Sequence, residues 1–289
     1  MPVVLGVDGG ATRTRAVIVD AQGTLLAYAS GPATNPNAVG LHRARARLRE
    51  LLSTCLARAG LERVDCALFG LAGINNQQEV QAMRTWLAGL AFSPLVIVEN
   101  DAVAAWAAAT GGRPGVVVIA GTGSIAFGVD AAGNRRRAGG WGHLFGDEGS
   151  GFYIATQALR AAARSHDGRG PATALLPALL RHFDLSSPQD LTRAVYRSGL
   201  EPGRIAALLP LVAQVARAGD PVARELFQQA GEQLAEQALA VITGLGLDDR
   251  GTEFPVGVSG GVFQCGPLVL APFTRRLTAQ APAARITAP

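Results

Sequence analysis

The sequence contains no lysine, so all 26 of its basic residues are arginine. This absence excludes the phosphate-binding loop GxxxxGK[ST], which requires a lysine, and any chemistry that proceeds through a Schiff base on a lysine amine. The formal net charge is only +4, and adjacent arginines occur only at 135–137 and 275–276. We therefore interpret the arginines as solvated surface and predict no nucleic-acid partner.

Cysteine is scarce as well, with only Cys55, Cys66 and Cys265. Their spacing is not paired, and no cluster of histidines lies near them in the sequence. Disulfide, zinc and iron–sulfur sites therefore lack support, and buried free thiols are the simplest interpretation.

Long apolar runs are also missing. No run of about 18 apolar residues escapes interruption by glycine or a polar residue, and no charged segment precedes a short apolar one as in a signal peptide. We expect a soluble, cytoplasmic protein with no membrane partner.

What the chain does have is enough apolar sequence for two domains. Its 289 residues are 48% hydrophobic, and strand and helix patterns alternate, which is typical of an α/β fold. The best linker is the glycine-rich segment 111–115, so we predict domains at 1–112 and 113–289. The expected strands are residues 3–7, 14–19, 24–30, 66–71, 95–98, 116–120, 125–129 and 254–258. The expected helices are residues 41–58, 77–90 and 101–110, a mostly helical insertion over 151–247 and a final helix after 261, with a polar loop at 31–40.

One pattern occurs twice, at residues 3–23 and 116–133. In each copy an apolar run meets a turn rich in glycine and hydroxyl residues, and a second strand-like run then ends in an Asp-x-x-Gly turn. Glycine at such a tip removes the Cβ atom and permits positive φ, so that backbone N–H groups can face an anion while hydroxyls add donors. We therefore predict two β-hairpins whose tips, facing one another, would clamp a phosphate.

Two familiar motifs match only superficially. Residues 257–261 fit the hydrolase elbow GxSxG, but no Asp, Glu or His follows Gly260, as the remaining members of that catalytic triad would require. Residues 121–126 fit the dinucleotide fingerprint GxGxxA, but the sequence continues as a strand, whereas the fingerprint must open a helix. Neither function is supported.

Carboxylates at the ends of the expected elements are better candidates. Asp8 ends the first strand before Gly9 and Gly10, where it could hold Mg²⁺ beside a phosphate or simply cap the turn. Asp101 begins a helix, where it could take a proton from a substrate hydroxyl or serve as an ordinary N-cap. Residues 141–151 gather Trp, His, Asp and Glu among glycines, which suits a small polyol substrate and could also be a surface loop.

Five such segments, in this order, resemble the N-acetylglucosamine kinase branch of the actin and hexokinase superfamily, together with the BadF/BadG/BcrA/BcrD-type ATPases. The resemblance runs from Val3 to about Arg285. It implies two ribonuclease H-like (actin-like ATPase) domains around an interdomain cleft, with ATP and Mg²⁺ as cofactors and a homodimer as the assembly. The segments are residues 8–14, 99–102, 120–124, 139–151 and 258–262.

The resemblance also implies roles for single residues. Asp101 matches the catalytic base that takes the proton from the sugar 6-hydroxyl, and Asp8 matches the residue that binds Mg²⁺ through water. The matching phosphate-binding and nucleotide-binding residues are Gly9, Gly10, Thr12, Gly121, Thr122, Gly123, Gly260 and Gly261. The matching sugar-binding residues are Asn35, Gly140, Trp141 and Asp147. The implied activity is ATP-dependent phosphorylation of an amino sugar, N-acetylglucosamine first and glucosamine second.

The resemblance leaves two rival functions and one departure. ATPase activators of dehydratases and reductases share this superfamily but need cluster cysteines, which the three cysteines here do not convincingly supply. A sugar-sensing protein without turnover would not need both Asp8 and Asp101. At the end, the sequence stops at Pro289, where relatives usually continue into a last helix.

Overall fold

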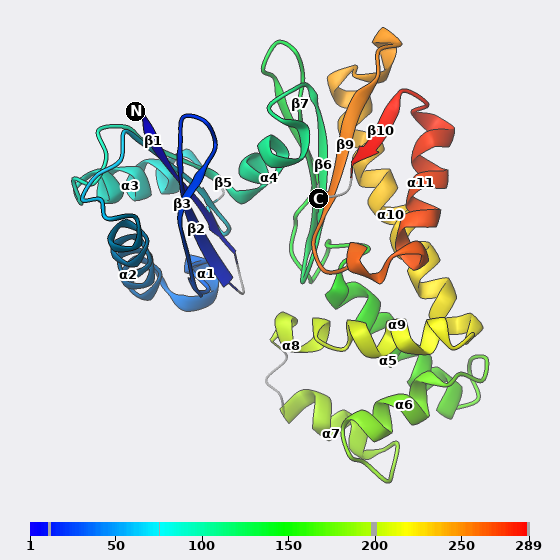
Figure 1. Ribbon diagram of the computed structural model, residues 1–289. Helices are drawn as coiled ribbons and strands as arrows, with labels where there is room; N and C mark the ends of the chain where they lie inside the picture. The colour runs from blue at the N-terminus through cyan, green and yellow to red at the C-terminus, as the bar shows by residue number, and fades with distance from the viewer. Residues whose placement is uncertain (11–12, 75, 198–200, 288–289) are drawn as a thin grey trace. The chain divides into compact units, whose positions relative to one another are not determined.

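The computed structural model describes residues 1–10, 13–74, 76–197 and 201–287. Two compact units divide the chain, Met1–Ala105 and Trp106–Pro289. The division falls inside helix α4 (Asp101–Thr110), and the expected linker at 111–115 follows that helix. Each unit has its own five-stranded sheet (Figure 1) and is described by itself below.

The sheet of the first unit has the strand order β3-β2-β1-β4-β5. Strands β1 to β3 form an antiparallel meander, and β4 and β5 run parallel to β1, so their carboxyl ends share one edge. The strands are β1 (Val3–Gly9), β2 (Arg13–Asp20), β3 (Leu25–Pro32), β4 (Cys66–Leu71) and β5 (Val96–Asn100). The helices besides α4 are α1 (Pro36–Val39), α2 (Leu41–Ala59) and α3 (Gln77–Ala88).

The sheet of the second unit repeats that plan with the order β10-β9-β6-β7-β8. Strands β6 to β8 are antiparallel, and β9 and β10 continue in parallel from β6. The strands are β6 (Gly115–Ala120), β7 (Ser124–Val129), β8 (Arg135–Gly139), β9 (Phe254–Ser259) and β10 (Ala284–Thr287). The α/β class and the internal repeat are therefore confirmed.

Helices fill the rest of the second unit, as expected for residues 151–247. Figure 1 shows α5 to α9 grouped beyond one end of this sheet, while the long α10 packs along β6, β7 and β8. The helices are α5 (Gly151–His166), α6 (Leu175–His182), α7 (Asp190–Arg197), α8 (Pro202–Ala206), α9 (Leu209–Arg217), α10 (Pro221–Leu245) and α11 (Pro267–Gln280). Two short 3₁₀ helices, Asp248–Arg250 and Phe263–Cys265, complete it.

Burial follows from the sequence pattern of each strand. In β1 the inward residues Leu5 and Val7 alternate with less buried ones, whereas nearly all of β6 is buried. A strand enclosed on both faces needs a continuous apolar run, and residues 116–120 supply one. Separate apolar clusters form the two cores, one around Phe69 and one around Phe227.

Three local expectations were wrong. The loop expected at 31–40 instead completes β3 and forms α1, which begins where the Asn35 side chain accepts a hydrogen bond from the Asn37 N–H and Pro36 fills the first turn. Strand β8 was missed because its arginines are exposed, and β10 because it is a short edge strand.

The cysteines are all free, with Cys55 and Cys265 buried and Cys66 only partly buried. Within the described part of the chain, no helix combines the length and the apolar character that crossing a membrane requires.

Candidate active site

The turn between β1 and β2 places Asp8 beside two glycines. The Gly10 N–H donates to the Arg13 carbonyl at 3.0 Å, which closes the turn. A Cβ atom at Gly9 would lie 2.5 Å from Cδ2 of Leu71 and 2.8 Å from Oγ1 of Thr34, so only glycine fits. Gly9 and Gly10 do not adopt positive φ, contrary to our reason for expecting glycine here. Close packing, rather than left-handed backbone, explains Gly9.

Asp8 is the acidic residue beside this turn. It faces Arg15 on β2 at 4.0 Å, and 61% of its side chain is exposed. Surrounding protein replaces enough of its hydration to raise the pKa of Asp8, and the positive charge of Arg15 offsets part of that rise. An exposed, ionisable oxygen pair at a sheet edge can bind a hydrated cation.

Asp101 reaches the same edge from the end of β5. Strands β1, β4 and β5 are parallel, and Asp8 is in register with Gly70, which is in register with Glu99. A Cβ atom at Gly70 would lie 2.5 Å from Cβ of Ala104 and 3.5 Å from Cα of Asp101. Gly70 therefore lets the first turn of α4 lie against β4. The sequence reading overlooked Gly70, although a glycine inside a buried strand signals a close approach.

Burial gives Asp101 the properties of a base. Desolvation is the main cause that raises the pKa of Asp101, and the negative charge of Asp8 raises it further, against hydrogen bonds that lower it. The two carboxylates therefore interact within the first unit. A carboxylate with a raised pKa holds a proton more tightly, which favours general base catalysis near neutral pH.

Asn35 lies on a second loop of the same unit. A Cβ atom at Gly73, where φ is 80°, would lie 2.1 Å from Oδ1 of Asn35, so Gly73 gives the amide its space. The next residue along, Ile74, accepts a hydrogen bond from Nδ2 of Asn100 at 2.9 Å. Oδ1 of Asn100 accepts from the Ala102 N–H at 3.0 Å. Asn100 therefore joins the loop beside Asn35 to the helix that carries Asp101.

The turn between β6 and β7 caps helix α5. The N–H groups of Gly151 and Phe152 donate to the carbonyls of Gly121 and Thr122, at 2.8 and 3.3 Å. The N–H of Gly121 donates to the Gly123 carbonyl at 2.9 Å. No described atom lies within 4 Å of a Cβ position at Gly121, so that side of the turn is open to a ligand. Here too the glycines of the tip lack positive φ.

Asp147 is buried against this turn. Its Oδ1 accepts the N–H of Ser124 at 3.3 Å, and a Cβ atom at Gly123 would lie 2.7 Å from its Oδ2. Burial raises the pKa of Asp147, while the Ser124 hydrogen bond and the charge of His143 lower it. Its φ of 59° is unusual for a residue other than glycine. Such a conformation persists only where neighbouring contacts enforce it, and it occurs most often at binding sites.

Trp141 and Gly140 precede Asp147 on the same loop. Gly140, with φ of 70°, donates to the Ser124 carbonyl at 2.9 Å. The Trp141 ring is 60% exposed, with the Arg137 guanidinium 5.0 Å from its centroid and the Phe145 ring 6.5 Å away. An exposed aromatic face beside a buried carboxylate can hold a sugar ring.

Gly260 and Gly261 follow β9 in the second unit. A Cβ atom at Gly260 would lie 2.3 Å from the Ala120 carbonyl oxygen, and φ there is 101°. The Val262 N–H donates to that same carbonyl at 3.0 Å. Gly261 has open space at its Cβ position among the described atoms. Gly260 is therefore held against the end of β6, whereas the Cβ side of Gly261 is open.

The structure brings the site residues together in two groups. Within the first unit they gather at the carboxyl ends of β1, β4 and β5, and within the second at the ends of β6 and β9 and on the loop after β8. Thr12 lies outside the described residues. The first group holds Asp8, Gly9, Gly10, Asn35 and Asp101. The second holds Gly121, Thr122, Gly123, Gly140, Trp141, Asp147, Gly260 and Gly261.

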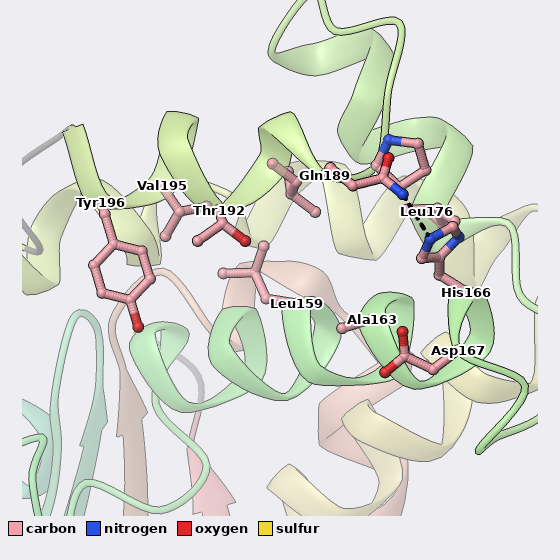
Figure 2. Close-up of a pocket in the computed structure, with 11 residues that line it drawn as sticks. Leu159, Ala163, His166, Asp167, Leu176, Gln189, Thr192, Val195 and Tyr196 are labelled. Carbon is pink, nitrogen blue, oxygen red and sulfur yellow. Dashed lines mark hydrogen bonds between the residues drawn. The ribbon is translucent and has the colours of Figure 1, made fainter.

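A cavity of about 390 Å³ lies elsewhere, between α5, α6 and α7 (Figure 2). Its apolar walls include Leu159 and Leu176, and a 3.5 Å contact joins Nε2 of His166 to Nε2 of Gln189 at one end. It contains none of the motif residues, and a pocket without the glycine turns cannot bind phosphate in the way that the sequence predicts.

Comparison with known proteins identifies sugar kinases as relatives of this chain. Over 266 residues the chain is 34% identical to an N-acetylmuramic acid/N-acetylglucosamine kinase of Clostridium acetobutylicum, covering 91% of this chain and 86% of the relative. It is 31% identical to an N-acetyl-D-glucosamine kinase of Dictyostelium discoideum, covering 90% and 85%. A solved structure from Chromobacterium violaceum, proposed to be an N-acetylglucosamine kinase, superposes with a TM-score of 0.80 at 30% identity, covering 100% of this chain and 95% of that one.

The match to a protein-family model covers nearly the same part of the chain as the motifs do. The family model matches residues 5–277, a span that runs from within β1 to within α11 and includes every described residue of both groups. The chain belongs to the BadF/BadG/BcrA/BcrD ATPase family.

Proposed function

We propose that this protein is an ATP-dependent amino-sugar kinase that phosphorylates N-acetylglucosamine at its 6-hydroxyl. The observation that carries the proposal is the pair of carboxylates at one sheet edge of the first unit. Desolvation raises the pKa of both, but Asp8 remains exposed, whereas Asp101 is half-buried and the charge of Asp8 raises its pKa further. Two carboxylates in different environments can take different roles, one as a cation ligand and one as a base.

Asp101 would act as the general base. Its raised pKa gives the carboxylate a stronger pull on the proton of a sugar hydroxyl, and its place at the start of α4 fixes its direction. The proton would move from the 6-hydroxyl to the Asp101 carboxylate as the sugar oxygen bonds to the γ-phosphorus of ATP, while the bond from that phosphorus to the β–γ bridging oxygen breaks and ADP leaves. Asn100 and Gly70 would hold helix α4 so that the Asp101 carboxylate stays within reach of the sugar hydroxyl.

Asp8 suits a hydrated Mg²⁺. No group of three metal-ligating side chains occurs among residues 1–10, 13–74, 76–197 and 201–287. Mg²⁺ bound to a nucleotide does not need one, because phosphate oxygens and water provide most of its ligands. When bound, Mg²⁺ neutralises the phosphate charge that builds up during transfer. Asp8 would hold it there through water.

Backbone amides and hydroxyls would take the role that lysine has in other nucleotide sites. We assign the phosphate contacts to Gly9, Gly10 and Thr12 on one turn and to Gly121, Thr122 and Gly123 on the other. The adenosine contacts would fall to Gly260 and Gly261. The open Cβ positions of Gly121 and Gly261 support close approach of a ligand. Catalysis would then rest on positioning and charge neutralisation.

The sugar contacts are assigned to Asn35, Gly140, Trp141 and Asp147. The exposed ring of Trp141 offers an apolar surface, and Asp147 and the Asn35 amide offer hydrogen-bond acceptors and donors. Because two curated relatives carry N-acetylglucosamine in their names, we place this sugar ahead of glucosamine.

An ATPase activator function is the alternative from another class. It would need cysteines placed for an iron–sulfur cluster, whereas Cys55 and Cys265 are buried in different units and Cys66 is partly buried on β4. This arrangement favours the kinase.

Three further assignments are proposals. We propose the domains 1–112 for Mg²⁺, catalysis and part of the sugar site, and 113–289 for ATP and the remaining sugar contacts. We propose a homodimer, which light scattering of the purified protein would test. Because ATP is supplied in the cytoplasm, we also propose that the enzyme acts there.

The decisive experiment is ADP release with MgATP and a panel of sugars. The panel contains N-acetylglucosamine, N-acetylmuramic acid, glucosamine, N-acetylmannosamine, glucose and a blank without sugar. We expect turnover that depends on N-acetylglucosamine and is lost in Asp101→Asn. Hydrolysis that is independent of sugar would support the ATPase alternative, and no turnover with any sugar would refute the kinase. Product NMR identifies the phosphorylated oxygen.

A further inference from the structure

A buried glutamine of α10 contacts the loop that carries the proposed sugar-binding residues. Gln237 is only 8% exposed, and its neighbours along the helix, Leu234, Ala238 and Val241, are fully buried and apolar. Placing a carboxamide in such a core costs free energy unless hydrogen bonds replace the lost water. Its contacts therefore indicate what it does there.

The amide nitrogen of Gln237 ties two segments together. Nε2 donates to the Glu148 carbonyl at 3.1 Å and to Oγ of Ser124 at 3.3 Å. Oγ of Ser124 donates to the same Glu148 carbonyl at 2.8 Å, and the Ser124 N–H binds Asp147 at 3.3 Å. One side chain from the core thus fixes the start of β7 against Asp147 and Glu148, at the end of the sugar loop, residues 139–148.

The other end of that loop also packs on Gln237. A Cβ atom at Gly139, where φ is 73°, would lie 2.5 Å from Oε1 of Gln237. Gly139 stands directly before Gly140 and Trp141, whereas Glu148 directly follows Asp147. Gln237 therefore contacts both ends of the segment 139–148. That segment includes Asp147, with its unusual φ of 59°, which requires support from outside.

The carboxamide is not optimised for stability. Its Oε1 is buried and has no hydrogen-bond partner within the described structure. A buried acceptor without a partner destabilises the fold, so an apolar side chain of equal length would suit this core at least as well. The donors of Nε2, rather than the packing, are what a glutamine adds here.

We propose that Gln237 is a positioning residue for the sugar site. It holds the segment 139–148 so that Trp141 and Asp147 keep their places, without touching the sugar itself. The inference rests on the proposed function, since Trp141 and Asp147 are assigned to sugar binding there.

The same helix offers a matched control one turn away. Gln233 also has a buried Oε1 without a partner, but its Nε2 donates to the Tyr153 hydroxyl at 3.0 Å instead of to the sugar loop. Gln233→Met and Gln237→Met therefore remove the same carboxamide, the first from a half-buried and the second from a buried residue, and only the second loses contact with the loop.

The test compares these variants in kinetics, stability and fluorescence. For Gln237→Met we expect the KM for the sugar to rise about tenfold, because the two hydrogen bonds that Nε2 donates are lost and Trp141 and Asp147 are no longer held in place. The KM for ATP should stay within about twofold and the melting temperature should not fall. Gln233→Met should leave both KM values near those of the unchanged protein. An unchanged sugar KM in Gln237→Met, or an equal rise in Gln233→Met, would overturn the proposal.

A readout without turnover separates this inference from the proposed function. With Trp86 and Trp106 replaced by Phe, Trp141 is the remaining tryptophan, and its emission and quenching by acrylamide report the loop directly. Gln237→Met should change both, and Gln233→Met should change neither. If Gln237→Met fails to fold, Gln237→Glu decides, since it keeps the length and removes the Nε2 donors. Unaltered Trp141 fluorescence in the folded variant refutes the positioning role whether or not any sugar is phosphorylated.

Discussion

The hairpins β1–β2 and β6–β7 are alike at one end and different at the other. At the far ends, Asp20 and Asp130 each accept two backbone N–H groups, from Gln22 and Thr24 and from Ala132 and Asn134. At the tips, the residue before the glycines is a charged Asp8 in the first hairpin and Ala120 in the second.

The tips also differ in what surrounds them. The first lies near a second carboxylate, Asp101, whereas the second packs against the buried Asp147 and caps α5. The comparison shows that one backbone plan can be kept while two carboxylates, Asp8 and Asp101, interact near one tip and the other tip caps a helix, and we propose cation and proton chemistry for the first. Substitutions at each end can test this division.

The largest effect is expected at the first tip. Asp101→Asn removes the proposed base, so kcat should fall by about 10²- to 10⁴-fold. Burial raises the pKa of Asp101, which means that its ionisation costs stability as pH rises through that value. The variant should therefore melt no lower than the unchanged protein at pH 7, and this gain should shrink towards acid pH. Calorimetry and ADP release check both.

The pH profile of the unchanged protein gives the matching control. Its kcat/KM should fall as pH is lowered through the raised pKa of Asp101, above the ordinary aspartate value of 3.8. A variant that loses both activity and melting temperature at pH 7 would argue for a structural role instead.

The second prediction concerns the cation at the same tip. Asp8→Asn should raise the Mg²⁺ concentration needed for half-maximal rate by about tenfold or more, because the neutral amide attracts the hydrated ion weakly. It should also lower the pKa of Asp101, since the negative charge of Asp8 raises it. A magnesium titration of the rate and ¹³C NMR of the Asp101 carboxyl measure the two effects. An unchanged magnesium dependence would contradict the assignment.

The second tip supplies a smaller and more selective test. In Gly123→Ala the added methyl would meet the Asp147 carboxylate at 2.7 Å, and such overpacking typically costs 1–3 kcal/mol. Gly121→Ala meets no described atom within 4 Å and needs no positive φ. We expect a lower melting temperature and a higher sugar KM only in Gly123→Ala, and a higher ATP KM without loss of stability in Gly121→Ala. Equal effects would mean that the two glycines do not differ in role.

The smallest effect is expected at the far end of the first hairpin. Hydrogen bonds from the Thr24 backbone, and then from neighbouring groups, lower the pKa of Asp20, against a smaller desolvation. Its charge therefore adds stability above the unfolded pKa, and this contribution is lost as pH falls through the folded value. At pH 7 the Asp20→Asn variant should have a slightly lower melting temperature than the unchanged protein. At acid pH the two melting temperatures should be equal, and kcat should match that of the unchanged protein at both pH values. A changed kcat would show that the two ends are not independent.

Much of the fold could be predicted because the information was local. The apolar runs of β1, β4 and β6, the repeated hairpins and the long helical region follow from periodicity and turn residues. Strand β8 could not be predicted from the sequence. Residues Arg135–Gly139 lack an apolar pattern of their own and form a strand by pairing with β7.

The candidate site divides in the same way. Asp8, Asp101 and Asp147 could be singled out because charged residues among glycines at the ends of elements are conspicuous in a sequence. Gly70, Gly73 and Gln237 could not be singled out in this way. Their roles depend on atoms that they contact, and those atoms belong to residues far away in the sequence. Even Gly9 and Gly123 were chosen for positive φ, whereas close packing explains them.

The sequence by itself determined the α/β class, the two hairpins and which carboxylates to consider, since periodicity, turn chemistry and motif order are properties of neighbouring residues. Only the tertiary structure decided that Asp8 is exposed while Asp101 is half-buried and Asp147 is buried, and that a glutamine from α10 reaches the loop of Trp141. Burial and electrostatic coupling depend on distances between segments remote in the chain, and those distances exist only once the sheets and helices have packed.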